Sequence, residues 1–286
     1  MGKADLDPLT RYGQTFVEET PALVKAKLSE LNDALAKETG KDVKFYNDAR
    51  DKCPDEVNDT FKLKFLRCEV FRVNDAVKRI IKYWKNRVEI FEEKAFMPLT
   101  LDKALKGDEK SLEISVLRDT HCKDDGGRAI LFFDPGRLPK NRDEYDKKSM
   151  VRSFWYTLHS VLEDGEVQRK GCVIIGHPKH APSKPDFELE KMQVGALRGS
   201  IPIRIGAIHI CHPPWFFELV WPVFKLMIGS VLRKRVNIHS GKDEKILGNL
   251  ESKFGIPKEK IPTDMSGGLL QLDHMAWLEE RRKAGL

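Results

Sequence analysis

Apolar residues recur at helical spacing through the first third of the chain. One such segment covers residues 21–37 and a longer one covers residues 74–91, with a shorter apolar segment at 61–71 between them. Strand-like alternation is missing from this part of the sequence. Residues 1–105 are therefore predicted to form a small all-α module, which ends in a linker with one short helix near residues 101–105.

The pattern changes after the turn signal Asp124-Asp125-Gly126-Gly127. Short continuous apolar runs, typical of strands buried on both faces, now alternate with amphipathic segments. This alternation predicts an α/β domain over residues 106–286, with a parallel or mostly parallel sheet and crossover helices. The predicted strands are 129–133, 172–175, 203–210 and 236–239, and the predicted helices are 150–162, 187–197, 215–232 and 272–282.

The helix predicted at residues 215–232 has an unusual composition. Glu218 and Lys225 are its only charged residues and share one face, while every other face is apolar. Such a helix is buried on nearly all sides, covers an apolar cavity, or contacts a bilayer. The two charges and Pro222 argue against a membrane-spanning helix, and Pro222 is expected to kink it.

Composition and charge restrict the partners. The chain has 286 residues with 50 basic and 44 acidic side chains, a net charge of +6. This mild excess is compatible with visits to an anionic surface. We expect no nucleic-acid partner, because no dense basic patch is interleaved with exposed aromatic residues.

The five cysteines are odd in number and form no Cys-x-x-Cys pair, and the N-terminus has no apolar signal core. A disulfide framework is therefore not expected, and a reducing, cytoplasmic compartment is predicted.

Motifs for common chemistries are missing from the sequence. There is no Gly-x-Gly-x-x-Gly after a strand, no Gly-x-x-x-x-Gly-Lys-Ser/Thr and no Gly-x-Ser-x-Gly. His209 and Cys211 share one strand face while His212 lies on the other, so these side chains do not converge on a metal. We therefore predict no catalytic residues, no metal and no cofactor. The weakest alternative is an enzyme acting on a lipid, for which Asp134, His177 and His209 are the first candidate catalytic residues.

Apolar volume is the remaining functional signal. Val151, Phe154 and Leu158 occupy one helix face, and further apolar residues surround the entry to the third strand. Together with the helix at 215–232 they could enclose a hydrophobic ligand, or they could pack as solid core. Composition does not separate these two possibilities, because the wall of a pocket and a core use the same residues.

Several segments, taken in order, resemble the CRAL-TRIO family, particularly its tocopherol-transfer and retinaldehyde-binding branch. The resemblance covers roughly residues 60–275, and the order and spacing of the segments are more specific than any one of them. The matching segments are FLRCEVFRVNDAVKRIIKYWKNR from Phe65, GRAILFFDPGR from Gly127, PIRIGAIHICHPPWFFELVWPVFK from Pro202, LRKRVNIHS from Leu232 and IPTDMSGG from Ile261.

The resemblance implies an α/β lipid-binding cage with a mobile helical lid. It implies that the protein binds one hydrophobic molecule or phospholipid and transfers it between membranes without catalysis. The implied cage residues are Phe133, Val151, Phe154, Leu158, Cys172, Leu197, Ile201, Ile203 and Ile208, and the implied lid residues are Phe217, Val220, Val223 and Phe224.

The resemblance also implies transient, peripheral contact with an anionic membrane. Arg67, Arg204 and Arg235 match basic sites that meet phosphoinositide headgroups in the family, and Arg233 is added on charge alone. Two other basic positions of the family carry Glu69 and Val231 here. An alternative function is a scaffold or adaptor of the same fold, acting through protein or phosphoinositide contacts without lipid transfer.

Overall fold

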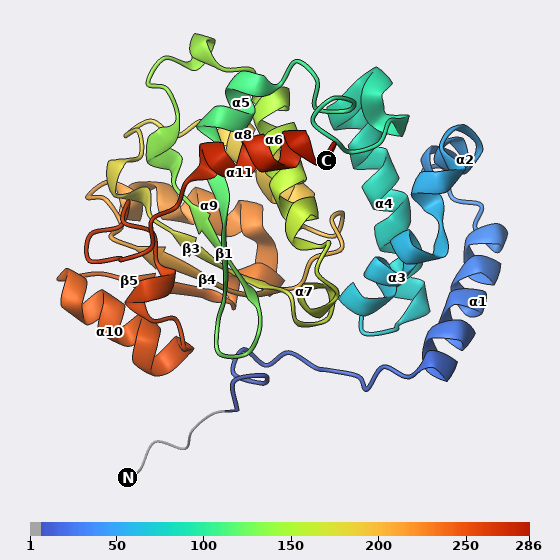
Figure 1. Cartoon of the computed structure of the whole chain (residues 1–286), viewed down its shortest axis with the longest axis horizontal. Coiled ribbons are helices and arrows are strands. Elements are labelled where there is room, and N and C mark those ends of the chain that lie inside the picture. The colour runs from blue at the N-terminus through green and yellow to red at the C-terminus, as the bar shows by residue number, and fades with distance from the viewer. Residues whose placement is uncertain (1–6) are drawn as a thin grey trace.

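A five-stranded sheet forms the centre of the protein in the computed structural model, which describes residues 7–286 (Figure 1). The strands lie side by side in sequence order; β2 to β5 are parallel and β1 runs antiparallel to β2. The prediction of a mostly parallel α/β sheet is confirmed. The strands are β1 Leu117–Lys123, β2 Ala129–Phe133, β3 Cys172–Gly176, β4 Ile205–Cys211 and β5 Val236–His239.

Strand β1 is absent from the sequence prediction, and its environment explains why. It is an edge strand with the sequence LRDTHCK, which has neither a continuous apolar run nor apolar alternation. One inward position is a charged residue, because Arg118 is buried and its guanidinium lies 2.9 Å from the Asp264 carboxylate. A buried ion pair at this position conceals the strand from a hydrophobicity pattern.

The described N-terminal part of the chain, residues 7–91, contains four helices, α1 to α4, and no strand. Helix α1 begins where Thr20 accepts a hydrogen bond from Leu23 N, and α3 begins where Asn58 accepts one from Phe61 N. Helix α2 was not predicted, because its sequence is largely polar and only Tyr46 and Ala49 are buried. The four helices are α1 Pro21–Lys37, α2 Val43–Lys52, α3 Asp59–Cys68 and α4 Val73–Phe91.

The remaining helices connect and cover the strands. Turns occupy residues 101–107, so the short helix predicted at 101–105 is not formed and α5 follows instead. In Figure 1, α11 crosses the front of α6 near the C-terminus, where Trp277 and Tyr156 have ring centres 5.9 Å apart. The helices are α5 Glu109–Ile114, α6 Lys147–Val161, α7 Gly165–Lys170, α8 Phe187–Leu197, α9 Phe217–Arg233, α10 Asp243–Phe254 and α11 His274–Lys283.

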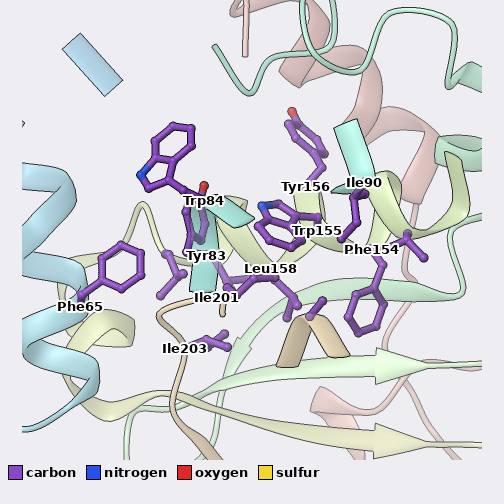
Figure 2. Close-up of a cluster of buried hydrophobic side chains, with 14 of the residues drawn as sticks. Phe65, Tyr83, Trp84, Ile90, Phe154, Trp155, Tyr156, Leu158, Ile201 and Ile203 are labelled. Atoms are coloured by element: carbon purple, nitrogen blue, oxygen red, sulfur yellow. The ribbon is translucent and has the colours of Figure 1, made fainter. Parts of the chain in front are cut away.

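One hydrophobic core joins the helical module to the sheet. Figure 2 shows Tyr83 of α4 beside Trp155 and Leu158 of α6, and the rings of Tyr83 and Trp155 have centres 5.2 Å apart. A second cluster covers the other sheet face, where Ile246 and Leu250 of α10 are fully buried. The division of the chain at residues 105 and 106 stays a prediction.

Helix α9 is interrupted near its end. Its backbone leaves helical geometry at Gly229, with φ 71° and ψ 175°, and not at Pro222, where the kink was expected. The Arg198 guanidinium packs against Gly229, and its Nη1 donates to the Met227 carbonyl at 2.7 Å. The interruption thus has its own polar partner, and the Gly-Ser pair at 229–230 is its signal in the sequence.

Candidate functional site

A cavity of about 200 Å³ lies between the sheet, α8 and α9. Because one water needs only about 10–15 Å³ measured in this way, the space is large enough for a guest molecule. Its walls are mostly apolar. Strands β2, β3 and β4 contribute Phe133, Ile174, Ile208 and Ile210, α6 contributes Phe154, and α8 contributes Val194 and Leu197.

Helix α9 closes the cavity with one face and exposes the other. The cavity face carries Phe216, Phe217, Val220, Trp221, Phe224, Ile228 and Leu232. On the outer face, Trp215 before the helix is 83% exposed, Leu219 is 74% exposed and Leu226 is 78% exposed. Of the three situations that fit its composition, burial on all sides is thus excluded. None of the described helices is long and apolar enough to cross a membrane.

The structure brings together seven of the thirteen predicted ligand residues. These line the cavity: Phe133, Phe154, Leu197, Ile208, Phe217, Val220 and Phe224.

The other six predicted ligand residues lie elsewhere. Four are buried outside the cavity wall: Val151, Leu158, Cys172 and Ile201. Ile203 faces a second hollow, described below, and Val223 is 42% exposed on the outer face of α9. The pattern of an all-round apolar helix offers no way to choose which face turns inward.

Two proline-rich loops complete the cavity, and the sequence analysis missed them. They follow the carboxyl ends of β2 and β3, where parallel sheets commonly bind ligands, and that rule is the signal that could have found them. Tyr145 and Asp186 link the loops by a hydrogen bond of 2.9 Å. The loop residues that line the cavity are Pro135, Leu138, Pro139, Lys140, Arg142 and Tyr145, and then Pro178, Ala181, Pro182, Lys184, Pro185 and Asp186.

A second hollow of about 470 Å³ has a different character. It lies between residues 13–15, the junction of α3 and α4, the end of α8, the break in α9 and the start of β4. We call it the basic groove. It is lined by one acidic side chain, Glu69, and by six basic ones, namely Arg72, Arg79, Lys82, Arg198, Arg204 and Arg235.

Backbone carbonyls hold two of these arginines in place. Arg204 donates to Thr15 O at 2.5 Å and to Arg169 O at 2.7 Å, and Arg235 donates to Ile205 O. A carbonyl satisfies the guanidinium without neutralising its charge.

The like charges of the groove affect one another. The pKa of Lys82 is lowered by burial and then by the neighbouring Arg198 and Arg79. Glu69 offsets part of the positive charge, because its carboxylate lies 2.5 Å from the Arg79 guanidinium. The groove is therefore electrostatically suited to an anion.

Two of the four basic residues predicted to contact a membrane line the basic groove, and two do not. Arg204 and Arg235 line the groove. Arg67 does not, because its guanidinium pairs with Glu19 and donates to Gln168 at 2.5 Å. Arg233 is exposed at the end of α9, outside the groove. Sequence analysis missed the other four basic residues of the groove, which are Arg72, Arg79, Lys82 and Arg198. The spacing of Arg79 and Lys82 on one face of a predicted helix was a usable signal.

The three candidate catalytic residues make separate local contacts. His209 Nδ1 lies 3.0 Å from His239 Nε2, and Asp134 accepts a hydrogen bond of 2.9 Å from Gly136 N. His177 is buried, and its pKa is lowered to about 4 by burial and by His212. Within residues 7–286, no cluster of three His, Cys, Asp or Glu side chains is arranged to hold a metal ion.

Comparison with protein families identifies a CRAL/TRIO domain over residues 120–267, which is more than half of the chain. The protein belongs to the CRAL/TRIO domain family. The matched CRAL/TRIO range begins within β1 and continues beyond η6 (Lys258–Lys260), so it includes α9 and the strands β2 to β5. Helices α1 to α4, which supply one side of the basic groove, precede it.

Named relatives agree with this assignment. Clavesin-1 of Pongo abelii is 24% identical over 286 residues, covering 96% of this chain and 75% of that protein. The alpha-tocopherol transfer protein-like protein of Mus musculus is 28% identical over 229 residues, covering 77% of this chain and 62% of its own length. The crystal structure of Sfh5 superposes with a TM-score of 0.54 at 14% identity, over 94% of this chain and 100% of that one, which shows a shared fold. Membership in the CRAL/TRIO family supports lipid binding and transfer as a general activity.

Proposed function

We propose that this protein binds one hydrophobic small molecule or lipid in the cavity beneath α9 and transfers it between membranes without catalysing a reaction. The observation that carries the proposal is the apolar cavity of about 200 Å³, closed by the inner face of α9. A molecule enclosed there is removed from water, and burial of its apolar surface lowers the cost of crossing the aqueous phase. We also propose that residues 106–286 carry the cavity, while the helical module of residues 1–105 supplies one wall of the basic groove.

Helix α9 is proposed to act as a mobile lid. The Pro213-Pro214 pair precedes its start, and its backbone leaves helical geometry at Gly229, near its end. Its outer face presents Trp215, Leu219 and Leu226 to solvent. Exposed apolar side chains of this kind bury themselves in the boundary between lipid headgroups and acyl chains, which would bring the lid to the membrane where the ligand enters or leaves.

The basic groove is proposed to bind an anionic membrane surface, including phosphoinositide headgroups, through Arg204 and Arg235. Arg67 and Arg233 are proposed to contact the same membrane surface. Because Arg67 is paired to Glu19, we expect its charge to contribute less than the charge of Arg233. Each basic side chain near such a surface contributes about 1 kcal/mol of attraction. The protein would then be cytoplasmic and associate with membranes peripherally and transiently.

Extraction and transfer assays test the proposal. The protein is purified without detergent. Native mass spectrometry of the intact complex gives the number of bound molecules per chain, and organic extraction of a second sample followed by mass spectrometry identifies them. We expect one lipid-sized molecule per chain, and transfer of that molecule from donor to acceptor vesicles at a rate that rises with protein concentration. Finding no copurifying ligand and no transfer between vesicles would reject the proposal.

A scaffold or adaptor is the alternative that one observation favours, because the exposed apolar face of α9 could also bind a protein. A pull-down that recovers one stoichiometric partner from a ligand-free protein would support it. The cavity beneath the same helix weighs toward the ligand-binding proposal, since a docking helix needs no empty volume behind it.

A further inference from the structure

Two polar side chains of α8 face the apolar cavity. Gln193 is 3% exposed and lines the cavity, and its Nε2 finds no hydrogen-bond acceptor in the part of the chain that the structure describes. Glu190, one helical turn earlier, lines the same cavity. The rest of the cavity wall is mostly aromatic and aliphatic, so a buried amide and a carboxyl are exceptions there.

The direction of these side chains follows from the helix. The residues of α8 that line the cavity are Glu190, Gln193, Val194 and Leu197, which lie on one face at helical spacing. Asp186 anchors the start of the helix, because its Oδ1 accepts from Leu189 N at 3.2 Å while Tyr145 donates to its Oδ2 at 2.9 Å. These contacts fix the orientation of α8 about its axis, so the side chains of Glu190 and Gln193 lie on the face that lines the cavity.

A solid core would not place an amide here. A buried donor without an acceptor lowers the stability of the folded protein, and leucine would fill the same volume without that cost. An unpaired donor in a ligand-sized cavity is explained when the ligand supplies the acceptor. Binding sites in general combine apolar walls with a few polar groups that orient the ligand.

The carboxyl of Glu190 complements the amide. Burial, and then the nearby Asp186, raises the pKa of Glu190 to about 7. Near neutral pH a large fraction of the carboxyl is ionised and accepts hydrogen bonds, while Gln193 Nε2 donates one. A hydroxyl group is the smallest partner that satisfies both, because it accepts through its oxygen and donates its proton.

We propose that Gln193 and Glu190 recognise a single hydroxyl group on an otherwise apolar ligand, so that the cavity selects an uncharged lipid alcohol. This inference rests on the proposed ligand-binding function. A hydrocarbon leaves Gln193 unpaired, and a fatty acid brings a second carboxylate against Glu190. Both are bound more weakly than the alcohol of the same chain length.

Competition against an apolar fluorophore tests this selection. Diphenylhexatriene is bound to the full-length protein and then displaced by dodecanol, dodecane or dodecanoic acid at pH 8. We expect dodecanol to bind about tenfold more tightly than dodecane, the effect of about one net hydrogen bond. In Gln193→Leu the preference should fall to about threefold or less, because only the Glu190 carboxylate still pairs with the hydroxyl. Glu190→Gln should keep the preference for the alcohol and bind the acid more tightly than the wild type does.

Val194→Ala is the matched control, because Val194 lines the same face of α8 and carries no polar side-chain atom. It should weaken dodecanol and dodecane by the same factor. Thermal melting of the ligand-free proteins gives a second readout: Gln193→Leu should raise the Tm, since it removes an unpaired donor, whereas Val194→Ala should lower it.

The outcomes separate this inference from the proposed function. Binding of diphenylhexatriene with equal affinities for dodecanol and dodecane in the wild type would overturn the hydroxyl selection and leave the apolar cavity intact. A preference for dodecanol that is undiminished in Gln193→Leu would overturn the role of Gln193. Failure of the wild-type protein to bind diphenylhexatriene would count against the proposed function, and the selection would fall with it.

Discussion

The cavity and the basic groove are neighbours with opposite chemistry. They share a wall, because Leu197, Ile228 and Leu232 line both. On one side of this wall lies a cavity of about 200 Å³ with mostly apolar lining, and on the other a groove of about 470 Å³ lined by six basic side chains. The two hollows differ in the segments that pack against this wall. The sheet and the inner face of α9 enclose the cavity, whereas the N-terminal residues 13–15 and the α3–α4 region bring polar and charged side chains to the groove.

The comparison shows that α9 borders one hollow suited to apolar ligands and one suited to anions. Apolar attraction is roughly proportional to the area removed from water, so it requires the closed cavity that the length of α9 provides. Charge attraction extends through solvent to about a Debye length, roughly 8–10 Å, so the groove can act from an open surface. Variants that affect one side and leave the other unchanged test whether the two hollows are functionally separate.

The largest effect is expected from a charge on the cavity side of α9. Phe224→Asp places a carboxylate against the cavity, where Phe224 and Phe187 have ring centres 5.7 Å apart. An unpaired charge in an apolar site costs several kcal/mol, so affinity for diphenylhexatriene should fall at least about 100-fold. Fluorescence titration measures this loss, and circular dichroism checks that the variant is folded.

Leu226→Asp is the control for this change, since Leu226 lies on the outer face of the same helix. It should bind the fluorophore as the wild type does and bind vesicles more weakly. Equal loss of fluorophore binding in both variants would show that the two faces of α9 are not distinct.

Acid should have the next largest effect, through a histidine that packs on Phe132 and His212 and does not line the cavity. His177, between the cavity-lining Gly176 and Pro178, is 1% exposed, and its pKa is lowered to about 4 by burial and by His212, His180 and Lys179. Above pH 6.5 the ring is neutral in both the folded and the unfolded chain. As the pH falls from 6.5 to about 4, only the unfolded chain takes up the proton, and the free energy of unfolding drops by about 3 kcal/mol.

Urea unfolding between pH 7.5 and 4.5 measures this dependence. His177→Phe should reduce its slope by the contribution of this ring, while His209 and His274, whose pKa values burial also lowers, keep theirs. His121→Gln serves as the control, because the Asp119 side chain raises the pKa of His121, so its contribution is present at acid pH and is lost as the pH rises. An unchanged slope in His177→Phe would refute the assignment.

Smaller effects are expected in the groove. Lys82→Gln and Arg204→Gln should each weaken binding to vesicles containing anionic lipid about fivefold, and about 30-fold together, since each charge contributes about 1 kcal/mol. The double variant should also show a weaker dependence on salt. Cosedimentation with vesicles measures both. Lys245→Gln, an exposed charge on α10, is the control, and a loss as large as that of the groove variants would mean that general charge is responsible.

The last prediction concerns stability at the break in α9, which lies beside the wall that the cavity and the groove share. At Gly229, with φ 71°, an added Cβ would lie 2.8 Å from Nη2 of Arg198. Gly229→Ala should therefore lower the free energy of unfolding by about 1–2 kcal/mol. At Gly195 in α8, nothing lies within 4 Å of an added Cβ, and Gly195→Ala should raise it by about 0.5–1 kcal/mol. Similar changes in thermal stability for the two variants would contradict this account.

Much of the fold was predictable because it depends on local periodicity. The helices α1 and α8 match their predicted ranges, the continuous apolar runs became β2 and β3, and the short strand predicted at 236–239 became β5. Strand β1 and helix α10 were not found, because each owes its place to partners distant in the chain. Arg118 of β1 pairs with Asp264, and α10 offers the sheet only Ile246 and Leu250 as fully buried contacts.

The sites were less predictable, because they depend on direction and not on composition. The sequence by itself determined that residues 215–232 form a helix too apolar for an ordinary surface and that basic residues follow it. Only the tertiary structure decided that Phe224 faces the cavity while Val223 faces solvent, and that Arg204 lies in the groove while Arg67 pairs with Glu19. The physical reason is that a helix apolar all round, like a charge on a long side chain, acquires its role from the segments packed against it, and those come from far along the chain.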